Sequence, residues 1–176
     1  MAYKGIGASP GVALGKALVV EHSELVIEKK SIDNVEAEIA KLEDAVAVSK
    51  EELVKVKEKA SEELGAEEAE IFEAHLLVLE DPELIGSAID KIKTESVNAE
   101  YALNEIKEMF VSMFESMDNE YMKERAADIK DVTNRILRHI LGIKVVDLSA
   151  LSEEVVLIAH DLTPSDTATM NKKIDR

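Results

Sequence analysis

The distribution of glycine and proline constrains this chain more than any other feature of its sequence. Of its 7 glycines and 3 prolines, five lie before Lys16, next to short β-type runs at Tyr3–Ile6 and Lys16–Val20. From Asp33 to Leu141 only three such residues occur, and apolar residues recur there at helical spacing. The sequence therefore predicts a strand-turn-strand start followed by a long helical excursion.

Capping and breaking signals divide this excursion into five helices. Asp33 followed by Glu36 resembles a capping box that opens the first helix, and Gly65 is expected to end it. A second helix should run from about Ala66 to Leu79. The third, fourth and fifth helices are predicted from Asp81-Pro82, Asn98 and Asn119, with a stop at Gly142. Their short connections favour antiparallel packing in a bundle.

After Gly142 the pattern returns to α/β. Val155–Ala159 is an apolar run of strand length, and Thr163-Pro164-Ser165-Asp166 is a turn that can open a last helix from about Ser165. Two or three short strands cannot enclose a core, so we expect further strands beyond Arg176. The predicted fold is mostly α with a small α/β part: a helical bundle (33–142) inserted into an incomplete α/β lobe (1–32 and 143–176).

Composition excludes several classes of function. The 176 residues carry 37 acidic and 21 basic side chains, a net charge of -16, which repels nucleic acids and anionic lipid surfaces. A basic or neutral protein partner suits this charge, although acidity can also serve solubility alone. The chain has no cysteine, and no apolar stretch reaches the roughly 18 residues of a membrane span. With no signal-peptide pattern at Met1, we expect a cytoplasmic protein.

The four histidines do not form a recognisable metal site. None of them has glutamate three residues before it, as a di-iron helical bundle would require. His160 stands at the end of the second predicted strand beside Ala159, Asp161 and Leu162, without the basic residues or backbone cradle that a phosphate needs. We therefore interpret His160 as a structural residue of a strand end and expect no bound metal.

The segment around His75 is unusually acidic. From Ser61 to Glu83 it holds nine acidic residues and no lysine or arginine. Carboxylates and apolar residues alternate there at three- and four-residue spacings, which would form a docking face for a basic protein, with the residues Glu67, Glu68, Ile71, Phe72, His75 and Val78. The alternative is a solvated acidic helix face with His75 packed among apolar neighbours.

Four segments spread along the chain together resemble Enzyme I of the phosphoenolpyruvate-dependent sugar phosphotransferase system. They are Gly5-Ile6-Gly7-Ala8-Ser9-Pro10-Gly11-Val12-Ala13 with Gly15-Lys16-Ala17; Ile71-Phe72-Glu73-Ala74-His75 with Leu79-Glu80-Asp81; Lys123-Glu124-Arg125-Ala126-Ala127-Asp128-Ile129-Lys130-Asp131 running to Leu141-Gly142; and Asp161-Leu162-Thr163-Pro164-Ser165-Asp166-Thr167-Ala168. The resemblance implies a helical lobe that binds the phosphocarrier HPr, inserted into an α/β phosphohistidine (swivelling) lobe.

The resemblance also implies which residues face HPr. They are Glu67, Glu68, Ile71, Phe72, His75, Val78, Asp81, Glu83 and Leu84, with Phe110, Phe114, Met122 and Arg125 from the later helices. By their chemistry alone, Phe110 and Phe114 could equally belong to the core, and Arg125 to a surface ion pair.

The family's phosphate-accepting histidine lies in a Gly-Gly-x-Thr-Ser-His motif that this sequence does not contain. We therefore expect no catalytic residue and no cofactor here, with Thr167 the counterpart of a residue that orients the absent histidine. The resemblance also implies that the full-length protein is a homodimer. Its C-terminal barrel would bind phosphoenolpyruvate and magnesium. The expected role of the chain is to bind HPr as an inactive part of a phosphotransferase. The alternatives are a helical-bundle adaptor and a relative that phosphorylates another acceptor.

Overall fold

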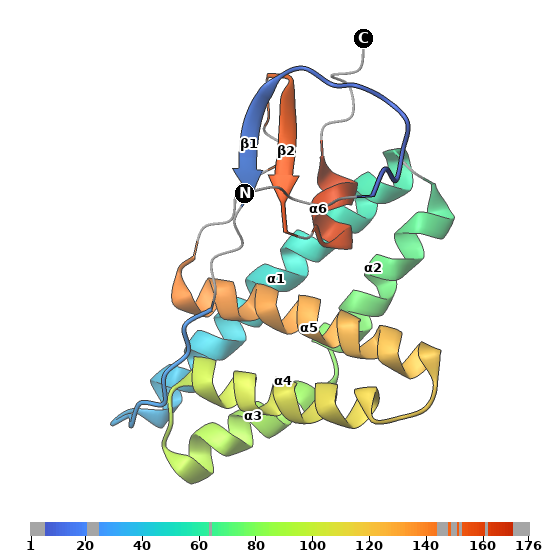
Figure 1. Cartoon of the computed structure of the whole chain (residues 1–176). Coiled ribbons are helices and arrows are strands. Elements are labelled where there is room, and N and C mark those ends of the chain that lie inside the picture. Colours follow the sequence, from blue (N-terminus) through green and yellow to red (C-terminus); the bar gives the residue numbers. More distant parts are fainter. Residues whose placement is uncertain are drawn as a thin grey trace.

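The computed structural model describes residues 6–20, 25–63, 65–143, 148, 151, 153–160 and 162–170. Along the chain, five long helices lie between two strands, and a short last helix follows the second strand (Figure 1). In chain order the elements are β1 (Lys16–Val20), α1 (Val35–Glu63), α2 (Ala66–Leu79), α3 (Pro82–Glu95), α4 (Ala99–Glu115), α5 (Glu120–Leu141), β2 (Val155–Ala159) and α6 (Pro164–Thr169). The mostly helical fold with a small α/β part is confirmed.

The helices α1 to α5 form a bundle around one hydrophobic core. The long helix α1 packs against α2 and α5, and α4 packs between α3 and α5 (Figure 1). Leu42, Leu53, Leu103, Ile136 and Leu137 are completely buried at the centre of this core. Because each of these helices buries one apolar face against its neighbours, the bundle is stabilised mainly by the packing that its helical periodicity predicts.

The start of α1 differs from the prediction by one residue. We predicted a cap at Asp33, but the Asn34 side chain accepts a hydrogen bond from the backbone N–H of Ala37 at 3.0 Å. The Asn34 carbonyl also accepts the first helical bond, from Glu38. Asparagine caps helices about as well as aspartate, so two adjacent candidates could not be separated by residue type. The predicted capping box from Asp33 to Glu36 is wrong.

The other helix boundaries inside the bundle agree with the prediction. Gly65 separates α1 from α2 with a positive φ of 120°, a backbone conformation that favours glycine. Asp81 accepts a hydrogen bond from the N–H of Glu83 at 2.8 Å, with Pro82 as the first residue of α3. Asn119 likewise accepts from Tyr121 at the start of α5.

Asn98 occupies the predicted cap position of α4 but does not cap it. Its side chain accepts from the backbone N–H of Lys30 at 2.7 Å and donates to the carbonyl of Glu28 at 3.0 Å. The first N–H of α4, on Ala99, is instead bound by the carboxylate of Glu38 from α1. Asn98 thus fastens the extended segment before α1 to the bundle.

The two strands form a parallel pair, with Lys16 opposite Val155 and Val20 opposite Ala159. Because β1 precedes the bundle and β2 follows it, the chain leaves the sheet and returns to it (Figure 1). The predicted run Tyr3–Ile6 falls almost wholly outside the described residues. Thr163 and Asp166 form a capping box that starts α6, which packs against α1. The domain boundaries at 32 and 142 stay a prediction.

No helix in the described ranges combines the length and the apolar composition that crossing a membrane requires.

Candidate docking site

A groove of about 360 Å³ opens where four helices of the bundle meet. It lies between the end of α2, the start of α3, the end of α4 and the start of α5. Its walls are mostly apolar and include one acidic residue, Asp81, and one basic residue, Arg125. The lining residues are Leu77, Val78, Asp81, Leu84, Phe110, Phe114, Tyr121, Met122, Arg125 and Ile129. We call this site the α2–α5 groove.

Seven of the residues that the resemblance assigned to HPr lie together in this groove. They are Val78, Asp81, Leu84, Phe110, Phe114, Met122 and Arg125. Sequence reasoning missed Leu77, Tyr121 and Ile129. Tyr121 could have been found from its position four residues before Arg125, where helix geometry places two side chains on one face. Leu77 is 59% exposed.

The remaining predicted residues divide into an exposed and a buried group. Glu67, Ile71 and Glu83 lie on the surface of α2 and α3 outside the groove. The Glu68 side chain lies outside the described residues. Phe72 and His75 are each only 1% exposed, because both point into the bundle core. In this structure Phe72 and His75 are therefore not surface residues, so the predicted docking face along α2 does not include them.

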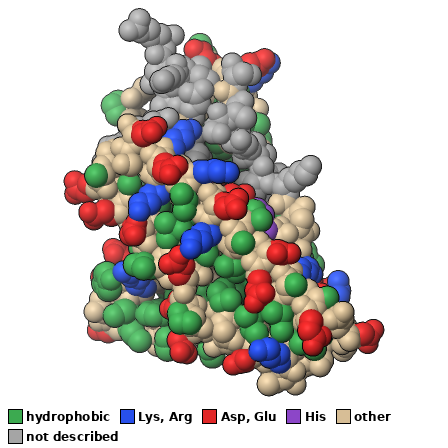
Figure 2. All heavy atoms as spheres, turned by 180° about the vertical axis from the view of Figure 1, so that it is seen from behind, with side chains coloured by type: hydrophobic (Ala, Val, Ile, Leu, Met, Phe, Trp, Pro, Cys, Tyr) green, Lys and Arg blue, Asp and Glu red, His purple; other side chains and the backbone are tan. Residues whose placement is uncertain are grey.

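Hydrophobic side chains gather over the lower half of one face of the molecule, as Figure 2 shows from behind. Acidic and basic side chains are scattered around them on the same face. An apolar centre with a charged surround is the arrangement that protein interfaces adopt, because the apolar centre supplies affinity and the charges at the edge affect encounter. The molecule therefore carries a surface with the composition of a docking face.

The guanidinium of Arg125 has a fixed position at the edge of the α2–α5 groove. Its Nε and Nη2 donate to the hydroxyl oxygen of Tyr121 at 3.1 and 2.7 Å, and the guanidinium carbon lies 5.1 Å from the Tyr121 ring centre. On the other side its Nη1 lies 3.8 Å from a carboxylate oxygen of Asp128. Arg125 is thus held between residues one helical turn to either side on α5.

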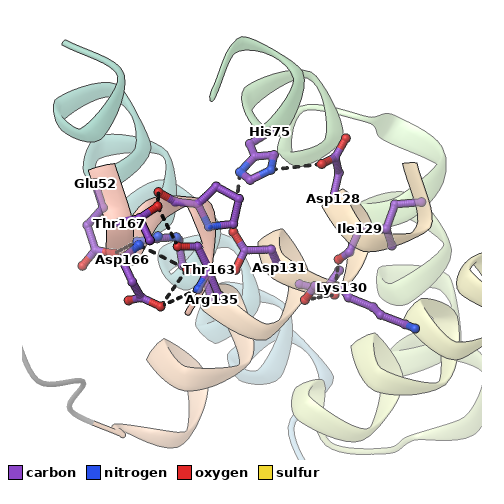
Figure 3. Close-up of polar contacts among 12 residues, drawn as sticks. Glu52, His75, Asp128, Ile129, Lys130, Asp131, Arg135, Thr163, Asp166 and Thr167 are labelled. Atoms are coloured by element: carbon purple, nitrogen blue, oxygen red, sulfur yellow. Dashed lines mark hydrogen bonds and ion pairs between the residues drawn. The ribbon is translucent and has the colours of Figure 1, made fainter. Parts of the chain in front are cut away.

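His75 lies behind the groove, between two carboxylates of α5 (Figure 3). Its Nε2 is 3.2 Å from Asp128 Oδ1, and its Nδ1 is 3.6 Å from Asp131 Oδ2. The ring also packs edge-on against Phe72, with the ring centres 5.8 Å apart. Burial raises the pKa of Asp131, and the charges of His75 and Arg135 oppose this rise only in part.

Thr167 lies on the exposed side of α6, and its hydroxyl donates to the backbone carbonyls of Thr163 and Pro164 (Figure 3). His160 is exposed at the end of β2, and His139 Nε2 lies 3.0 Å from the carboxylate of Glu52. Across the part of the chain that the structure describes, no three His, Asp or Glu side chains are grouped so that they could hold a metal ion. The role of Thr167 stays a prediction.

Comparison with known proteins identifies the class to which this fold belongs. Residues 4–125 match the sequence pattern of the N-terminal region of phosphoenolpyruvate-utilising enzymes. The chain therefore belongs to this family. Within it, the chain corresponds to the N-terminal part of Enzyme I, the phosphoenolpyruvate-protein phosphotransferase.

Curated relatives and a solved structure support the narrower assignment. The phosphoenolpyruvate-protein phosphotransferase of Priestia megaterium is 62% identical over 170 residues, and that of Bacillus subtilis (strain 168) is 58% identical over 170 residues. Each match covers 97% of this chain but only 30% of the relative, so the chain spans less than a third of these proteins.

A solution structure of Enzyme I (nEIt) matches 95% of this chain and 68% of its own, with a TM-score of 0.85 and 53% identity. The N-terminal domain of a nitrogen-type Enzyme 1, at 23% identity and a TM-score of 0.70, shares the fold.

Proposed function

We propose that this chain is the part of a phosphotransferase that binds the phosphocarrier HPr and positions it for phosphoryl transfer. The observation that carries the proposal is the α2–α5 groove, which gathers seven of the contact residues that the resemblance implies, from four elements of the bundle and their ends. A site built on packed helices holds its residues more precisely than one built on loops, and precise placement is what an in-line transfer between two proteins needs. Membership of the Enzyme I family supports the same role.

Two parts of the surface would share the work of binding. Half-buried aromatic residues in the groove, Phe110 and Phe114, are suited to anchor an apolar side chain of the carrier. The exposed carboxylates Glu67 and Glu83 lie outside the groove, where they would attract basic residues of the carrier and speed its encounter. We therefore assign affinity mainly to the groove and association rate mainly to the carboxylates.

We also propose that this chain accepts no phosphoryl group itself. The reason lies in the three histidines that the structure describes: His75 is 1% exposed, His139 is engaged by Glu52, and His160 adjoins apolar and acidic residues. Phosphoenolpyruvate and magnesium are assigned to a part of the parent enzyme outside these residues. Incubation with phosphoenolpyruvate, magnesium and the C-terminal domain of a relative should leave the chain unlabelled. Acid-labile phosphate on any histidine would contradict this.

Calorimetric titration of the chain with HPr tests the anchoring role of the groove. We expect Phe114→Ala to weaken binding about thirtyfold, because a truncated anchor at an interface centre costs roughly 2 kcal/mol. Met113→Ala is the matched control, since Met113 is exposed on the same helix but does not line the groove. No binding of HPr to the folded wild-type chain would refute the proposal and leave the adaptor alternative.

Charge reversal tests the role of the carboxylates. The double variant Glu67→Lys/Glu83→Lys should lower the association rate about tenfold at low salt, and the effect should shrink as salt rises. Glu43→Lys/Asp44→Lys makes the same change in net charge on exposed positions of α1, whose N-terminal half lies away from the α4–α5 connection (Figure 1). Equal slowing by both variants would mean that only total charge matters and would contradict the role assigned to these two carboxylates.

A further inference from the structure

A continuous chain of polar contacts runs from the edge of the α2–α5 groove into the bundle core. Tyr121, Arg125 and Asp128 follow one another at four- and three-residue spacing on α5, so their side chains share one face. Arg125 donates twice to the Tyr121 hydroxyl and faces Asp128 with its remaining nitrogen. The position of the guanidinium therefore depends on where Asp128 holds its carboxylate.

The position of Asp128 is set by a different helix. His75, on α2, places its Nε2 at 3.2 Å from Asp128 Oδ1 on α5, so this hydrogen bond links the two helices (Figure 3). The imidazole is buried and packs against the edge of the Phe72 ring, and its Nδ1 lies 3.6 Å from Asp131 without forming a hydrogen bond. Because the surrounding packing leaves a buried ring little room to move, His75 acts as a fixed point for Asp128.

We propose that His75 is a positioning residue for the groove: through Asp128 it fixes the orientation of Arg125, without touching the partner itself. This inference rests on the proposed docking function. Arginine is a long, flexible side chain whose ordering at an interface costs free energy on binding. Contacts that order it beforehand remove part of that cost. The contacts from Tyr121 and Asp128 do this for Arg125, and His75 supplies the anchor for Asp128.

The proposal also accounts for a conflict between sequence and structure. The resemblance placed His75 among the residues that face HPr, whereas the structure buries it completely beneath them. Sequence alone does not distinguish a residue that contacts the partner from a buried residue that positions such a contact. The contact chain explains how His75 can matter for docking from its buried position.

Two variants of His75 separate positioning from packing. His75→Gln keeps an N–H donor close to the place of Nε2, whereas His75→Leu fills the space without any donor. We expect His75→Leu to weaken HPr binding roughly threefold to tenfold, the range expected for residues coupled within one network. His75→Gln should restore binding to within about twofold of wild type. Equal binding by His75→Leu and wild type would overturn the proposal.

A double-mutant cycle with Arg125→Ala identifies the route. If His75 acts through Arg125, His75→Leu should have no further effect on HPr affinity once Arg125 is absent. If His75→Leu weakens HPr binding by the same factor with and without Arg125→Ala, His75 does not act through Arg125 and the proposal is overturned. Should His75→Leu fail to fold, Asp128→Asn is carried through the same cycle, since Asn keeps the shape of Asp but loses the charge that faces Arg125.

A measurement without the partner distinguishes failure of this inference from failure of the docking function. In the free chain, the Nε–H signal of Arg125 in NMR spectra should be slow to exchange and sharp in wild type and His75→Gln, and broadened in His75→Leu. If wild type does not bind HPr but this pattern holds, the docking function fails and the positioning chain stands. If the signal is the same in all three proteins, the positioning chain is refuted whatever HPr does.

Discussion

The helical bundle and the α/β end of this molecule differ in how far each encloses its own apolar residues. The five helices α1 to α5 share a core in which large side chains such as Leu42 and Ile136 are completely buried. In the paired strands, Val20 is buried, but Val19 is 55% and Ile158 50% exposed. A two-stranded sheet is marginally stable alone, so the difference teaches that the bundle carries the stability of the chain.

This contrast also concerns function. The α2–α5 groove lies entirely on elements of the bundle, and its walls are continuous with the core. Thr167, on α6, and His160, directly after β2, lie outside the bundle. The candidate docking groove thus lies on the region that encloses its own core.

The largest expected effect is the difference in lost stability when the same isoleucine side chain is truncated in the bundle and in the sheet. Ile136→Ala should lower the free energy of unfolding by about 2–5 kcal/mol, because it leaves a cavity in a filled core. The matched change Ile158→Ala on β2 removes a half-exposed side chain and should cost much less, about 1 kcal/mol. Urea denaturation followed by far-UV circular dichroism measures both. Equal losses would break the comparison and make the sheet a full partner in stability.

A smaller effect is expected where the segment leaving β1 is fastened to the bundle. Asn98→Ala removes both side-chain bonds to the backbone of Glu28 and Lys30 and should cost about 1–3 kcal/mol, since it leaves partly buried backbone groups unpaired. Asn119→Ala, at the cap of α5, removes one exposed bond and should cost about 1 kcal/mol. Denaturant unfolding compares the two. A cost for Asn119→Ala equal to or above that of Asn98→Ala would contradict the fastening role.

The smallest effects are pH-dependent and of opposite sign at two carboxyl groups of the bundle. Burial raises the pKa of Asp131, so its contribution to stability is present below its ordinary pKa of about 4 and is lost as pH rises through the raised value. Burial acts to raise the pKa of Glu100 too, but hydrogen bonds from Asn98, the backbone and Lys41 outweigh burial and lower it. Its contribution is therefore present above its ordinary pKa and is lost as pH falls.

Two neutral variants check these signs. Relative to wild type, Asp131→Asn should gain stability as pH rises from about 4 to 7. Glu100→Gln should instead lose stability relative to wild type over the same rise, because the wild-type carboxylate gains its favourable bonds there. Unfolding free energies of both variants and wild type at several pH values provide the measurement. A difference from wild type that does not vary with pH would contradict the assignment for that residue.

Much of the fold follows from local sequence signals. Gly65, Pro82 and Asn119 mark helix boundaries because each has a backbone or capping chemistry that few residues share. At Asn34 and Asn98, local capping signals did not predict the observed hydrogen bonds. The first competes with an adjacent aspartate of equal capping strength, and the second is taken over by a segment far away in the chain, which no local rule can anticipate.

Many residues of the candidate site could be named from the sequence, but which of them are exposed and which are buried could not. Helical spacing groups Phe72 and His75 with exposed carboxylates such as Glu67, but spacing alone does not say which stripe of a bundle helix faces inward. In the structure that stripe is decided by the packing of α2 on α1 and α5, a property of three helices together. Tyr121 was missed although its four-residue spacing to Arg125 places the two side chains on one helix face.

The parallel pairing of β1 with β2 has a consequence for the order in which the chain folds. The two strands are separated in the sequence by the entire bundle, and closing so long a loop costs entropy before any strand contact forms. Contacts within and between neighbouring helices are far more local and form faster. The bundle is therefore expected to assemble first and to bring the strand-bearing ends together, so that the sheet is the last part of this chain to form.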